Sequence, residues 1–356
     1  MSKIAIITDT HFGARNDTLV FSQYFEKFYN DIFFPYLKDN NINTVVHMGD
    51  VFDRRKFINY KSLFDAKRYF FKPLADNNIK TYMLAGNHDT FYKTTNEVNS
   101  VSLLLKEFEN ITTFDEPCDN LYIESNGYSE PVVLMPWICK ENYERAVNII
   151  KNTNNSILFG HLEVKGFEMI RGQFCTDGLD TGLFNKFDMV FSGHFHHKSD
   201  NGTVYYTGNP YQTNWMDYKD PRGFHIFDLK NRNLEFIENP YEMFHKYVYN
   251  DENIEATQVQ EMDFSMYQDC YVKVIVEQKN NPYVFDLILE KMYANGVADL
   301  NVVETFADVE DDIEIDQAQD TITILSGYID NMEDNVDKKN LDLLMRRLYN
   351  EALTSE

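Results

Sequence analysis

The chain has 356 residues, with 33 Lys and Arg against 57 Asp and Glu and a net charge of −24. This length exceeds one compact core and predicts two domains, with room for a smaller appendage. The charge excludes a uniformly basic nucleic-acid footprint, and no apolar run approaches the ~20 residues that cross a bilayer. The start of the chain lacks a signal-peptide pattern, and the four cysteines lack paired spacing, so we expect a cytoplasmic protein with reduced thiols.

The first 240 residues alternate between strand-like and helix-like stretches, which predicts a layered α/β fold. The predicted strands are Lys3–Thr8, Asn43–Met48, Lys80–Ala85, Val132–Pro136, Ser156–Phe159 and Asp188–Ser192. The predicted helices between them are Leu19–Leu37, Tyr60–Asp76, Glu97–Phe108 and Glu141–Lys151. After His196 the pattern changes to short strands with turn signals, which we expect to be antiparallel, at Thr203–Thr207, Gly223–Leu229 and Asn233–Glu238.

A domain boundary is predicted at Asn239-Pro240, because a residue before proline is disfavoured in the helical conformation. Residues 241–318 are then expected to form a small α+β module. Its predicted elements are a strand at Cys270–Glu277, an amphipathic stretch at Tyr283–Tyr293 and a strand near Leu300–Thr305.

The last segment, residues 319–356, predicts a helix-loop-helix with an apolar face on each helix. Those faces either dock on the protein itself or bind a partner. The apolar positions that would form a partner surface are Ile322, Leu325, Ile329, Leu341, Leu344, Met345 and Leu348.

The acidity is concentrated in the C-terminal third of the chain. Residues 1–240 hold 25 Lys and Arg against 31 Asp and Glu, whereas residues 241–356 hold 8 against 26. If the protein acts on DNA, bound cations, local basic patches or a partner must offset the repulsion.

Seven side chains suited to metal binding occur in five short blocks, each after an apolar, strand-like run. The blocks are Asp9-Thr10-His11, Gly49-Asp50-Val51-Phe52-Asp53, Gly86-Asn87-His88-Asp89, Gly160-His161 and Gly193-His194-Phe195-His196. Because parallel strands end at one edge, the blocks could converge on one rim of one sheet. Carboxylate, imidazole and amide groups without cysteine suit divalent ions such as Mn²⁺ or Fe²⁺. The pattern indicates metal-assisted hydrolysis.

Single blocks remain open to simpler interpretations. Asp50 could be a helix N-cap, the block at Asn87 could be a polar turn, and His161 alone could be an ordinary loop histidine. The five blocks in this order are a much stronger signal than any one of them. The absence of a glycine-rich phosphate loop and of a GxSxG elbow argues against an ATPase or a serine hydrolase.

The five blocks together resemble the calcineurin-like metallophosphoesterase superfamily. Within it, residues 48–53, residues 84–89 and Pro136-Trp137 resemble the SbcD-type nucleases. The run Asp220-Pro221-Arg222-Gly223-Phe224 adds a similarity to the recombination endonuclease subunits of large tailed phages. The resemblance implies a metallophosphoesterase fold of two β-sheets flanked by helices, with a small capping domain, in the host cytoplasm if the gene is a phage gene.

The resemblance also implies two Mn²⁺ ions per chain, with Mg²⁺ or Fe²⁺ as substitutes. The first ion would be held by Asp9, His11, Asp50 and His196. The second would be held by Asp50, Asn87, His161 and His194, so that Asp50 bridges the two.

His88 would not be a ligand in this resemblance. It would stabilise the transition state or protonate the leaving oxygen, and Asp53 would orient it. Many relatives place histidine where this chain has Asp53, so the role of Asp53 is the weakest of these implications. The basic run Arg54-Arg55-Lys56 contacts phosphate or is a solvated loop; we favour the contact.

The function implied is a DNA nuclease, both 3′→5′ exonuclease and endonuclease, that processes DNA ends for recombination and double-strand-break repair. Its expected partners are DNA, an SbcC-type coiled-coil ATPase, and a second copy of the chain within a heterotetramer. Two alternatives remain: a phosphatase or small-molecule phosphodiesterase on the same scaffold, and a non-catalytic DNA-end tether.

Overall fold

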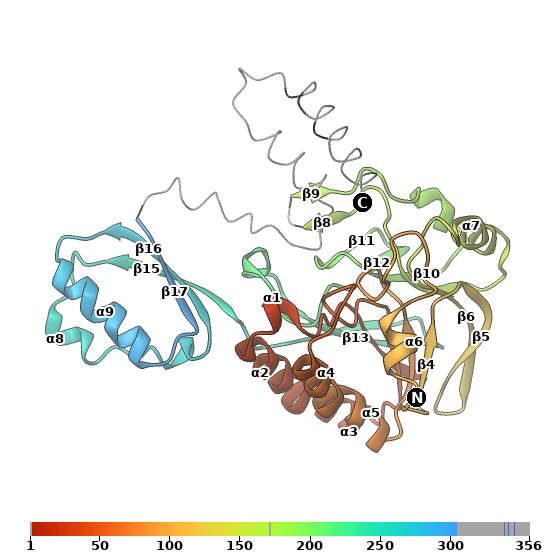
Figure 1. Cartoon of the computed structure of the whole chain (residues 1–356), viewed down its shortest axis with the longest axis horizontal. Helices are drawn as coiled ribbons and strands as arrows, with labels where there is room; N and C mark the ends of the chain where they lie inside the picture. The colour runs from red at the N-terminus through yellow and green to blue at the C-terminus, as the bar shows by residue number, and fades with distance from the viewer. Residues whose placement is uncertain (1, 171, 305–337, 339–340, 342–344, 346–356) are drawn as a thin grey trace. The chain divides into compact units, whose positions relative to one another are not determined.

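The computed structural model describes residues 2–170, 172–304, 338, 341 and 345. The chain divides into two compact units, Met1–Asp308 and Val309–Glu356. In the first unit, two six-stranded sheets and a smaller three-stranded sheet follow one another along the sequence (Figure 1). Within the described part of the chain, no helix is both long and apolar enough to cross a membrane.

The first sheet has the order β14-β13-β1-β2-β3-β4. Its strands β1 to β4 pair in parallel, while β13 and β14 add to the β1 edge in antiparallel fashion. The bounds are β1 Lys3–Ile7, β2 Thr44–His47, β3 Lys80–Leu84, β4 Ile111–Phe114, β13 Gly223–Asp228 and β14 Leu234–Glu238. Near-continuous apolar runs such as β1 are expected for parallel strands buried on both faces.

The second sheet has the order β11-β12-β10-β7-β6-β5. Its bounds are β5 Cys118–Ser125, β6 Tyr128–Met135, β7 Ile157–His161, β10 Met189–Gly193, β11 Ser199–Asp200 and β12 Val204–Tyr206. One prediction was wrong here: β12 pairs in parallel with β10, and only its other neighbour β11 is antiparallel to it. The loop between β10 and β12 carries the last metal block and crosses back over the sheet edge.

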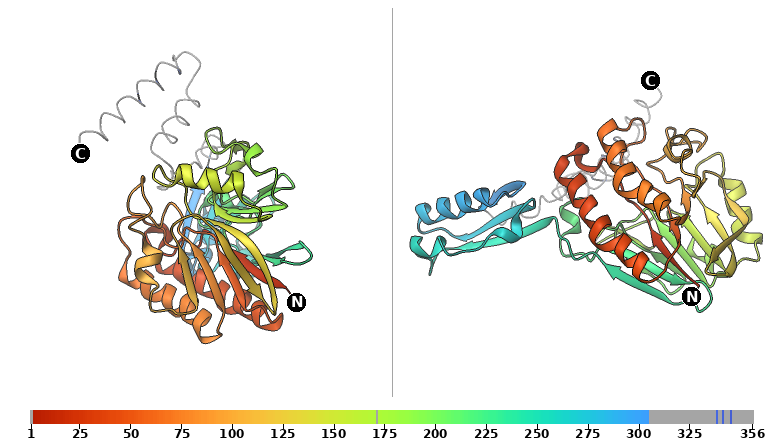
Figure 2. Two further views of the ribbon diagram at one scale, coloured as in Figure 1. Left: turned by 90° about the vertical axis from the view of Figure 1, so that its right-hand side faces the viewer. Right: turned by 90° about the horizontal axis from the view of Figure 1, so that it is seen from below.

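The two sheets pack face to face between helical layers (Figure 2). Ile6 and Val46 of the first sheet share one apolar core with Phe159 and Phe191 of the second. A second, aromatic-rich core lies between the first sheet and its helices. Those segments are α2 Leu19–Phe28, the π-helical turn η1 Tyr29–Phe33, α3 Phe34–Asp39, α4 Tyr60–Ala66, the π-helical turn η2 Lys67–Phe71, α5 Lys72–Asp76 and α6 Ser100–Leu104.

The outer face of the second sheet is covered by shorter elements, which form a third core with it. They are α7 Tyr143–Asn152, the hairpin β8 Glu168–Ile170 and β9 Gln173–Phe174, and the 3₁₀ turn η3 Thr181–Phe184. A short left-handed turn, α1 Ala14–Asp17, and the 3₁₀ turn η4 Trp215–Asp217 lie in loops.

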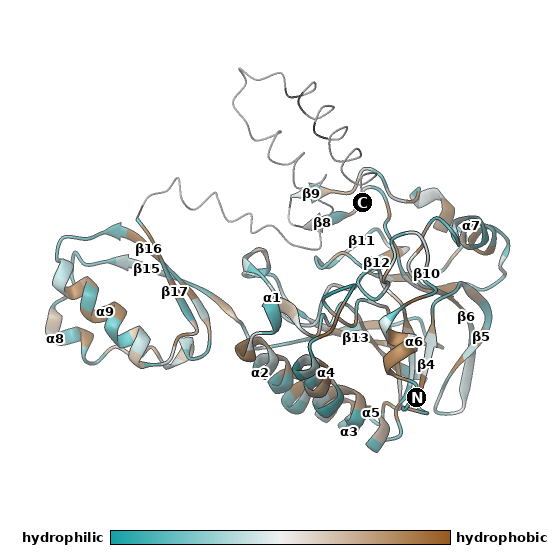
Figure 3. Cartoon of the chain, viewed as in Figure 1, coloured by the Kyte–Doolittle hydropathy of each residue, from teal (hydrophilic) through white to brown (hydrophobic). Residues whose placement is uncertain are grey.

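The third sheet, in the order β15-β16-β17, is entirely parallel and has its own apolar core. It consists of β15 Phe244–Asn250, β16 Tyr271–Gln278 and β17 Asp299–Val303, with α8 Ala256–Val259, the 3₁₀ turn η5 Ser265–Tyr267 and α9 Pro282–Ala294. Hydrophobic and hydrophilic segments alternate along α9 (Figure 3), and its apolar side chains belong to the core. This agrees with the predicted α+β module, while the boundaries at 240 and 318 stay predictions.

Most predicted helices are observed, with changed lengths. The predicted helix Glu97–Phe108 is reduced to α6, because Asn99 caps its N-terminus and residues 90–98 form turns. Of the predicted partner positions, Leu341 and Met345 are helical and partly buried. The others, Ile322, Leu325, Ile329, Leu344 and Leu348, lie outside the described residues.

Candidate metal centre

The seven predicted ligands meet at a rim that both six-stranded sheets share. The first sheet contributes Asp9, His11, Asp50 and Asn87, just beyond the ends of β1, β2 and β3. The second sheet contributes His161 at the end of β7, and His194 and His196 just after β10. The expectation of one rim of one sheet was therefore too narrow. Two sheets packed face to face bring their carboxyl ends together and supply ligands from both sides.

Asp9, His11 and His196 form the first group that could hold a metal ion. The Nε2 atoms of His11 and His196 are 3.0 Å apart, and each lies 4.0 Å from Oδ1 of Asp9. Asp9 and His11 are buried, and His196 is partly exposed. Two imidazole nitrogens that face each other beside a buried carboxylate are suitably placed to coordinate one cation.

Asp50, His161 and His194 form the second such group. His161 Nε2 lies 3.3 Å from Oδ2 of Asp50. The side-chain oxygen of Asn87 completes it, 2.9 Å from His161 Nε2 and 2.8 Å from His194 Nδ1.

Asp50 lies between the two groups. Its Oδ2 is 3.9 Å from His11 Nε2 in the first group and 3.3 Å from His161 Nε2 in the second. Its other oxygen, Oδ1, accepts a hydrogen bond of 2.7 Å from the backbone N–H of His88. A single carboxylate in this position can contribute to both groups, as two-metal sites require.

Four of the candidate ligands have left-handed backbone conformations that residues other than glycine rarely adopt. The φ angles are 51° at Asp9, 41° at His11, 52° at Asp50 and 85° at His194. Such residues cost on the order of 1–3 kcal/mol each and persist where the surroundings hold them in place. Backbone hydrogen bonds provide that hold, from Asp9 N to Gly49 O at 3.0 Å and from His11 N to Asp50 O at 3.1 Å.

Two glycines in the blocks are explained by close approaches. Gly49 has φ 105°, and a Cβ there would lie 2.7 Å from Nδ1 of His161. A Cβ on Gly86 would lie 2.2 Å from Oδ1 of Asp50. Only glycine therefore lets these two loops pack against the ligands at that distance.

The donor set fits divalent cations, because burial has already removed the proton from part of it. Burial, together with the nearby His88, lowers the pKa of His11 well below its usual value, and burial and His161 do the same for His194. Burial alone would also lower the pKa of His161, but the carboxylate of Asp50 raises it to about 9. Against burial, the charges of His161 and His88 hold the pKa of Asp50 well below normal. Neutral imidazoles around an ionised carboxylate are the protonation states that metal binding needs.

His88 lies beside these groups, with its ring edge-on to His11 at 4.9 Å between centroids. Its Nδ1 is 2.5 Å from the backbone carbonyl oxygen of Asp53. A carbonyl can only accept, so Nδ1 carries the proton, and Nε2 is the nitrogen that can exchange a proton with a reacting group. The carboxylate of Asp53 lies 3.7 Å from Nδ1 of His11 instead. The predicted orientation of His88 by Asp53 thus has a backbone contact to support it.

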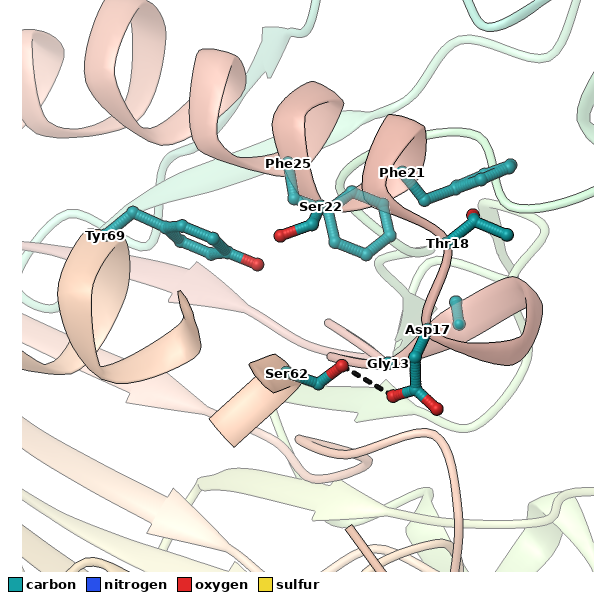
Figure 4. A pocket seen from close by; sticks show the side chains of 9 residues that line it. Gly13, Asp17, Thr18, Phe21, Ser22, Phe25, Ser62 and Tyr69 are labelled. Atoms are coloured by element: carbon teal, nitrogen blue, oxygen red, sulfur yellow. Dashed lines mark hydrogen bonds between the residues drawn. The ribbon is translucent and has the colours of Figure 1, made fainter. Parts of the chain in front are cut away.

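The basic run after the second block is partly engaged within the protein. Arg54 donates a hydrogen bond of 2.6 Å to the side chain of Asn16 and lies 3.3 Å from the carboxylate of Asp17. Asp17 in turn accepts from Ser62 at 2.5 Å (Figure 4). Arg54 therefore fixes the left-handed turn α1, and Lys56 is exposed. Arg55 is partly buried.

The small pocket drawn in Figure 4 lies behind this turn. It is lined by Gly13, Ala14, Asp17, Thr18, Phe21, Ser22, Phe25, Ser62 and Tyr69. None of these is a candidate ligand, so the pocket belongs to the packing between α1, α2 and α4 rather than to the metal centre.

Asp89 ends the third block, and the structure shows a role for it that the sequence does not predict. Its buried carboxylate accepts hydrogen bonds from the backbone N–H groups of Val51, Phe52 and Gly86 at 2.9–3.3 Å. It therefore joins the loop of Asp50 to the loop of Asn87. Burial and the charge of Asp50 raise the pKa of Asp89 to about 6. Its position inside a block was the only signal in the sequence.

Arg222 supports the last metal loop, a role that its sequence context does not predict. Its buried guanidinium donates to the backbone carbonyl of His196 and to the side chain of Asn209. It also pairs with Asp217 at 2.6 Å and with Asp220 at 2.8 Å. Planar guanidinium groups suit such multiple fixed contacts. The run Asp220-Pro221-Arg222 is thus a brace for His196.

Two further side chains hold the ligands in place. Trp137 packs against the imidazoles of His194 and His161, with ring centroids 5.0 and 6.0 Å apart. His47 is buried in β2, where its Nδ1 accepts from the N–H of Gly49 and its Nε2 contacts the hydroxyl of Thr10 at 3.0 Å. Both contacts are with the ligands or with the loops that carry them.

The comparison with protein families decides the class of this centre. The model described as calcineurin-like phosphoesterase matches residues 2–198, which contain all seven candidate ligands. The chain belongs to the calcineurin-like phosphoesterase family. Its fold of two mixed sheets flanked by helices is the metallophosphoesterase fold, and its two groups of metal-capable residues fit a phosphodiesterase.

Relatives of this phosphoesterase carry nuclease names. It is 32% identical to exonuclease subunit 1 of Enterobacteria phage T4, over 89% of this chain and 90% of the relative. It is 30% identical to the SbcD component of the nuclease SbcCD of Staphylococcus saprophyticus, over 29% of this chain and 35% of the relative. A solved structure reported as a novel archaeal phosphodiesterase overlaps 67% of this chain and 99% of its own, at a TM-score of 0.32 and 14% identity. The two named nucleases support a nuclease within the family.

Proposed function

We propose that the protein is a metal-dependent DNA nuclease, with 3′→5′ exonuclease and endonuclease activity, that processes DNA ends for recombination and double-strand-break repair. The observation that carries the proposal is Asp50 between two groups of ligands, with His88 at their edge. The similarity to the phage exonuclease subunit over 89% of the chain supports DNA as the substrate.

The centre would hold two Mn²⁺ ions, with Mg²⁺ or Fe²⁺ as substitutes. Asp9, His11, His196 and Asp50 would bind one, and Asp50, Asn87, His161 and His194 the other. When bound, such a pair of cations would activate a water molecule and neutralise charge on the phosphate oxygens.

The chain's own residues supply the remaining steps. His88, fixed through Nδ1 by the carbonyl of Asp53, presents Nε2 to the leaving oxygen, which takes a proton as its bond to phosphorus breaks. Asp89 and Arg222 keep the ligand loops at fixed distances, so that little reorganisation is needed during the reaction. Arg55 and Lys56 would contact DNA phosphates. Arg54 would contribute chiefly by holding α1.

A partner protein is part of the proposal. The relative from the nuclease SbcCD supports a coiled-coil ATPase of the SbcC type as that partner, with the chain as a homodimer inside a heterotetramer. The apolar positions predicted between Ile322 and Leu348 would bind it. Deleting residues 339–356 should leave metal binding intact and abolish association with the ATPase. Unchanged association would refute this assignment.

The alternative, a phosphatase on the same scaffold, is separated by substrate. We would incubate the purified protein with linear duplex DNA and with 4-nitrophenyl phosphate, in Mn²⁺ or Mg²⁺, alone and with its ATPase. The proposal predicts DNA fragments and little 4-nitrophenol. Hydrolysis of the monoester with intact DNA under every condition would favour the phosphatase.

A further inference from the structure

Three lysines gather around two aromatic rings next to the metal centre, in a chain whose net charge is −24. The Nζ atoms of Lys219 and Lys246 lie 5.2 and 5.3 Å from the ring centroid of Tyr218. The Nζ of Lys273 lies 4.3 Å from the indole of Trp215. These distances are within the range of cation–π attraction, so the rings hold the ammonium groups in place.

The register of the third sheet puts two of these lysines side by side. Lys246 on β15 pairs with Lys273 on β16, which pairs with Asn301 on β17. Paired residues on neighbouring strands project from the same face, so this row carries two positive charges and no carboxylate. The next row, toward the start of the strands, holds one carboxylate, that of Asp299. Like charges directly opposite each other are destabilising, which calls for a reason outside the sheet.

The row lies on the sheet face away from the helices. The residues that alternate with it, Tyr249, Val272 and Val274, form the apolar core with α9. On the lysine side, Trp215 packs against Phe244 with ring centroids 4.9 Å apart. The loop of Trp215 and Tyr218 therefore borders the row of lysines, and loop and row form one surface.

The carboxylates in this loop are occupied by other partners. Asp217 is bonded by Arg222 and by the backbone N–H of Thr213, at 2.6 Å each. Asp220 is bonded by Arg222 and by Nδ1 of His197, at 2.8 Å each. Both are buried, so they contribute little negative charge to the surface that the lysines occupy.

Lys219 also has a left-handed backbone, with φ 57°. This conformation is rare for a residue other than glycine, and it places the lysine beside Tyr218 at an energetic cost. The residue that follows, Asp220, contacts His197, the neighbour of the candidate ligand His196. The lysine surface thus continues directly from the last metal loop.

We propose that Lys219, Lys246 and Lys273, held by Tyr218 and Trp215, bind the phosphate backbone of a DNA strand that leaves the metal centre. The inference rests on the proposed nuclease function and names where the substrate lies. A polymer with one phosphate per nucleotide matches a row of fixed ammonium groups, whereas a small phosphate ester would not reach from the metal ligands to this row. The contacts would give affinity without sequence preference.

Lys219 and Lys246 are the test positions, because Lys273 is only 7% exposed and its replacement could disturb folding. Lys219→Gln and Lys246→Gln would be compared with Lys38→Gln, which removes the same charge from an exposed position on α3. Binding of a fluorescein-labelled linear DNA would be measured by anisotropy in EDTA over a series of salt concentrations. Hydrolysis of bis(4-nitrophenyl) phosphate in Mn²⁺ would report on the metal centre alone.

Each test variant should bind DNA several-fold more weakly and lose about 0.9 from the slope of log K against log salt. Its hydrolysis of the small diester should equal that of the wild type and of Lys38→Gln. Unchanged DNA affinity and slope would overturn the surface while leaving the nuclease assignment intact. A parallel loss of small-diester hydrolysis would also overturn it, since the lysines would then act on the metal loops. If the wild type neither binds nor cleaves DNA, the proposed function itself fails.

Discussion

The backbone carbonyl oxygen of Asp53 lies 2.5 Å from Nδ1 of His88. This contact fixes the tautomer of a histidine that sits among candidate metal ligands without belonging to either group. It separates two roles that sequence alone merges, because His88 adjoins Asn87 in one block. Asn87 faces His161 and His194, whereas His88 faces His11 and the loop of Asp53.

Replacing His88 by Ser should preserve metal binding and lower turnover of DNA. Loss of a general acid typically costs about 100- to 10,000-fold in rate. Metal content by inductively coupled plasma mass spectrometry and single-turnover DNA cleavage would check both halves. Loss of metal from this variant would show that His88 is a ligand. Asp53→Ala is the matched control: it keeps the backbone carbonyl, so it should slow turnover much less.

Replacing Arg222 by Lys should weaken metal binding. Lysine cannot donate at once to the His196 carbonyl, Asn209, Asp217 and Asp220, so the loop of His196 loses its brace. Residues that orient ligands typically contribute about 10- to 100-fold to metal affinity. Mn²⁺ titration followed by electron paramagnetic resonance would measure the loss. Arg232→Lys makes the same change at a site that pairs with Glu130, away from the ligands, and should leave the affinity unchanged.

Replacing Gly86 by Ala should disrupt the centre through Asp50. The new Cβ would lie 2.2 Å from Oδ1 and 2.3 Å from the backbone nitrogen of Asp50, so the bridging carboxylate must move. Metal content should fall below two ions per chain. Gly127→Ala serves as the control, since nothing lies within 4 Å of its Cβ, although φ 82° there adds backbone strain. Equal metal content in the two variants would contradict this role of Gly86.

His225 should make the protein less stable in mild acid. Burial, with a smaller contribution from Lys198, lowers its pKa to about 3 in the folded chain. Between pH 6.5 and 3 the unfolded chain binds a proton that the folded chain does not, so stability falls as pH falls, by up to about 1.4 kcal/mol per pH unit. Urea unfolding at pH 7 and pH 4.5 should show a smaller drop for His225→Leu than for the wild type. Equal drops would mean that His225 is not responsible.

Much of the fold could be predicted from local pattern. Runs such as Lys3–Thr8 and Asn43–Met48 are almost wholly apolar, and the blocks that follow them meet as expected because parallel strands end at one rim. The parallel pairing of β12 with β10 could not be predicted, since three residues, Val204–Tyr206, carry no signal of strand direction. Neither could the sharing of ligands between two sheets, which follows from long-range packing.

The supporting residues were also beyond the sequence. Arg222 is 26 residues from His196, and only the fold brings its guanidinium to that carbonyl. Lys246 and Lys273 are separated by a helix and several turns, so their pairing depends on strand register. Arg54 was predicted to contact phosphate, yet its bonds to Asn16 and Asp17 arise from a left-handed turn that no local pattern announces.

The central claim is that two cations sharing Asp50 cleave DNA phosphodiester bonds. The most direct measurement titrates Mn²⁺ into the metal-free protein and follows bound metal and cleavage of end-labelled linear duplex DNA in the same samples. We predict that cleavage appears as the second ion binds, and that Asp50→Asn binds less metal and does not cleave. Full cleavage by metal-free protein, or undiminished cleavage by Asp50→Asn, would contradict the two-metal nuclease.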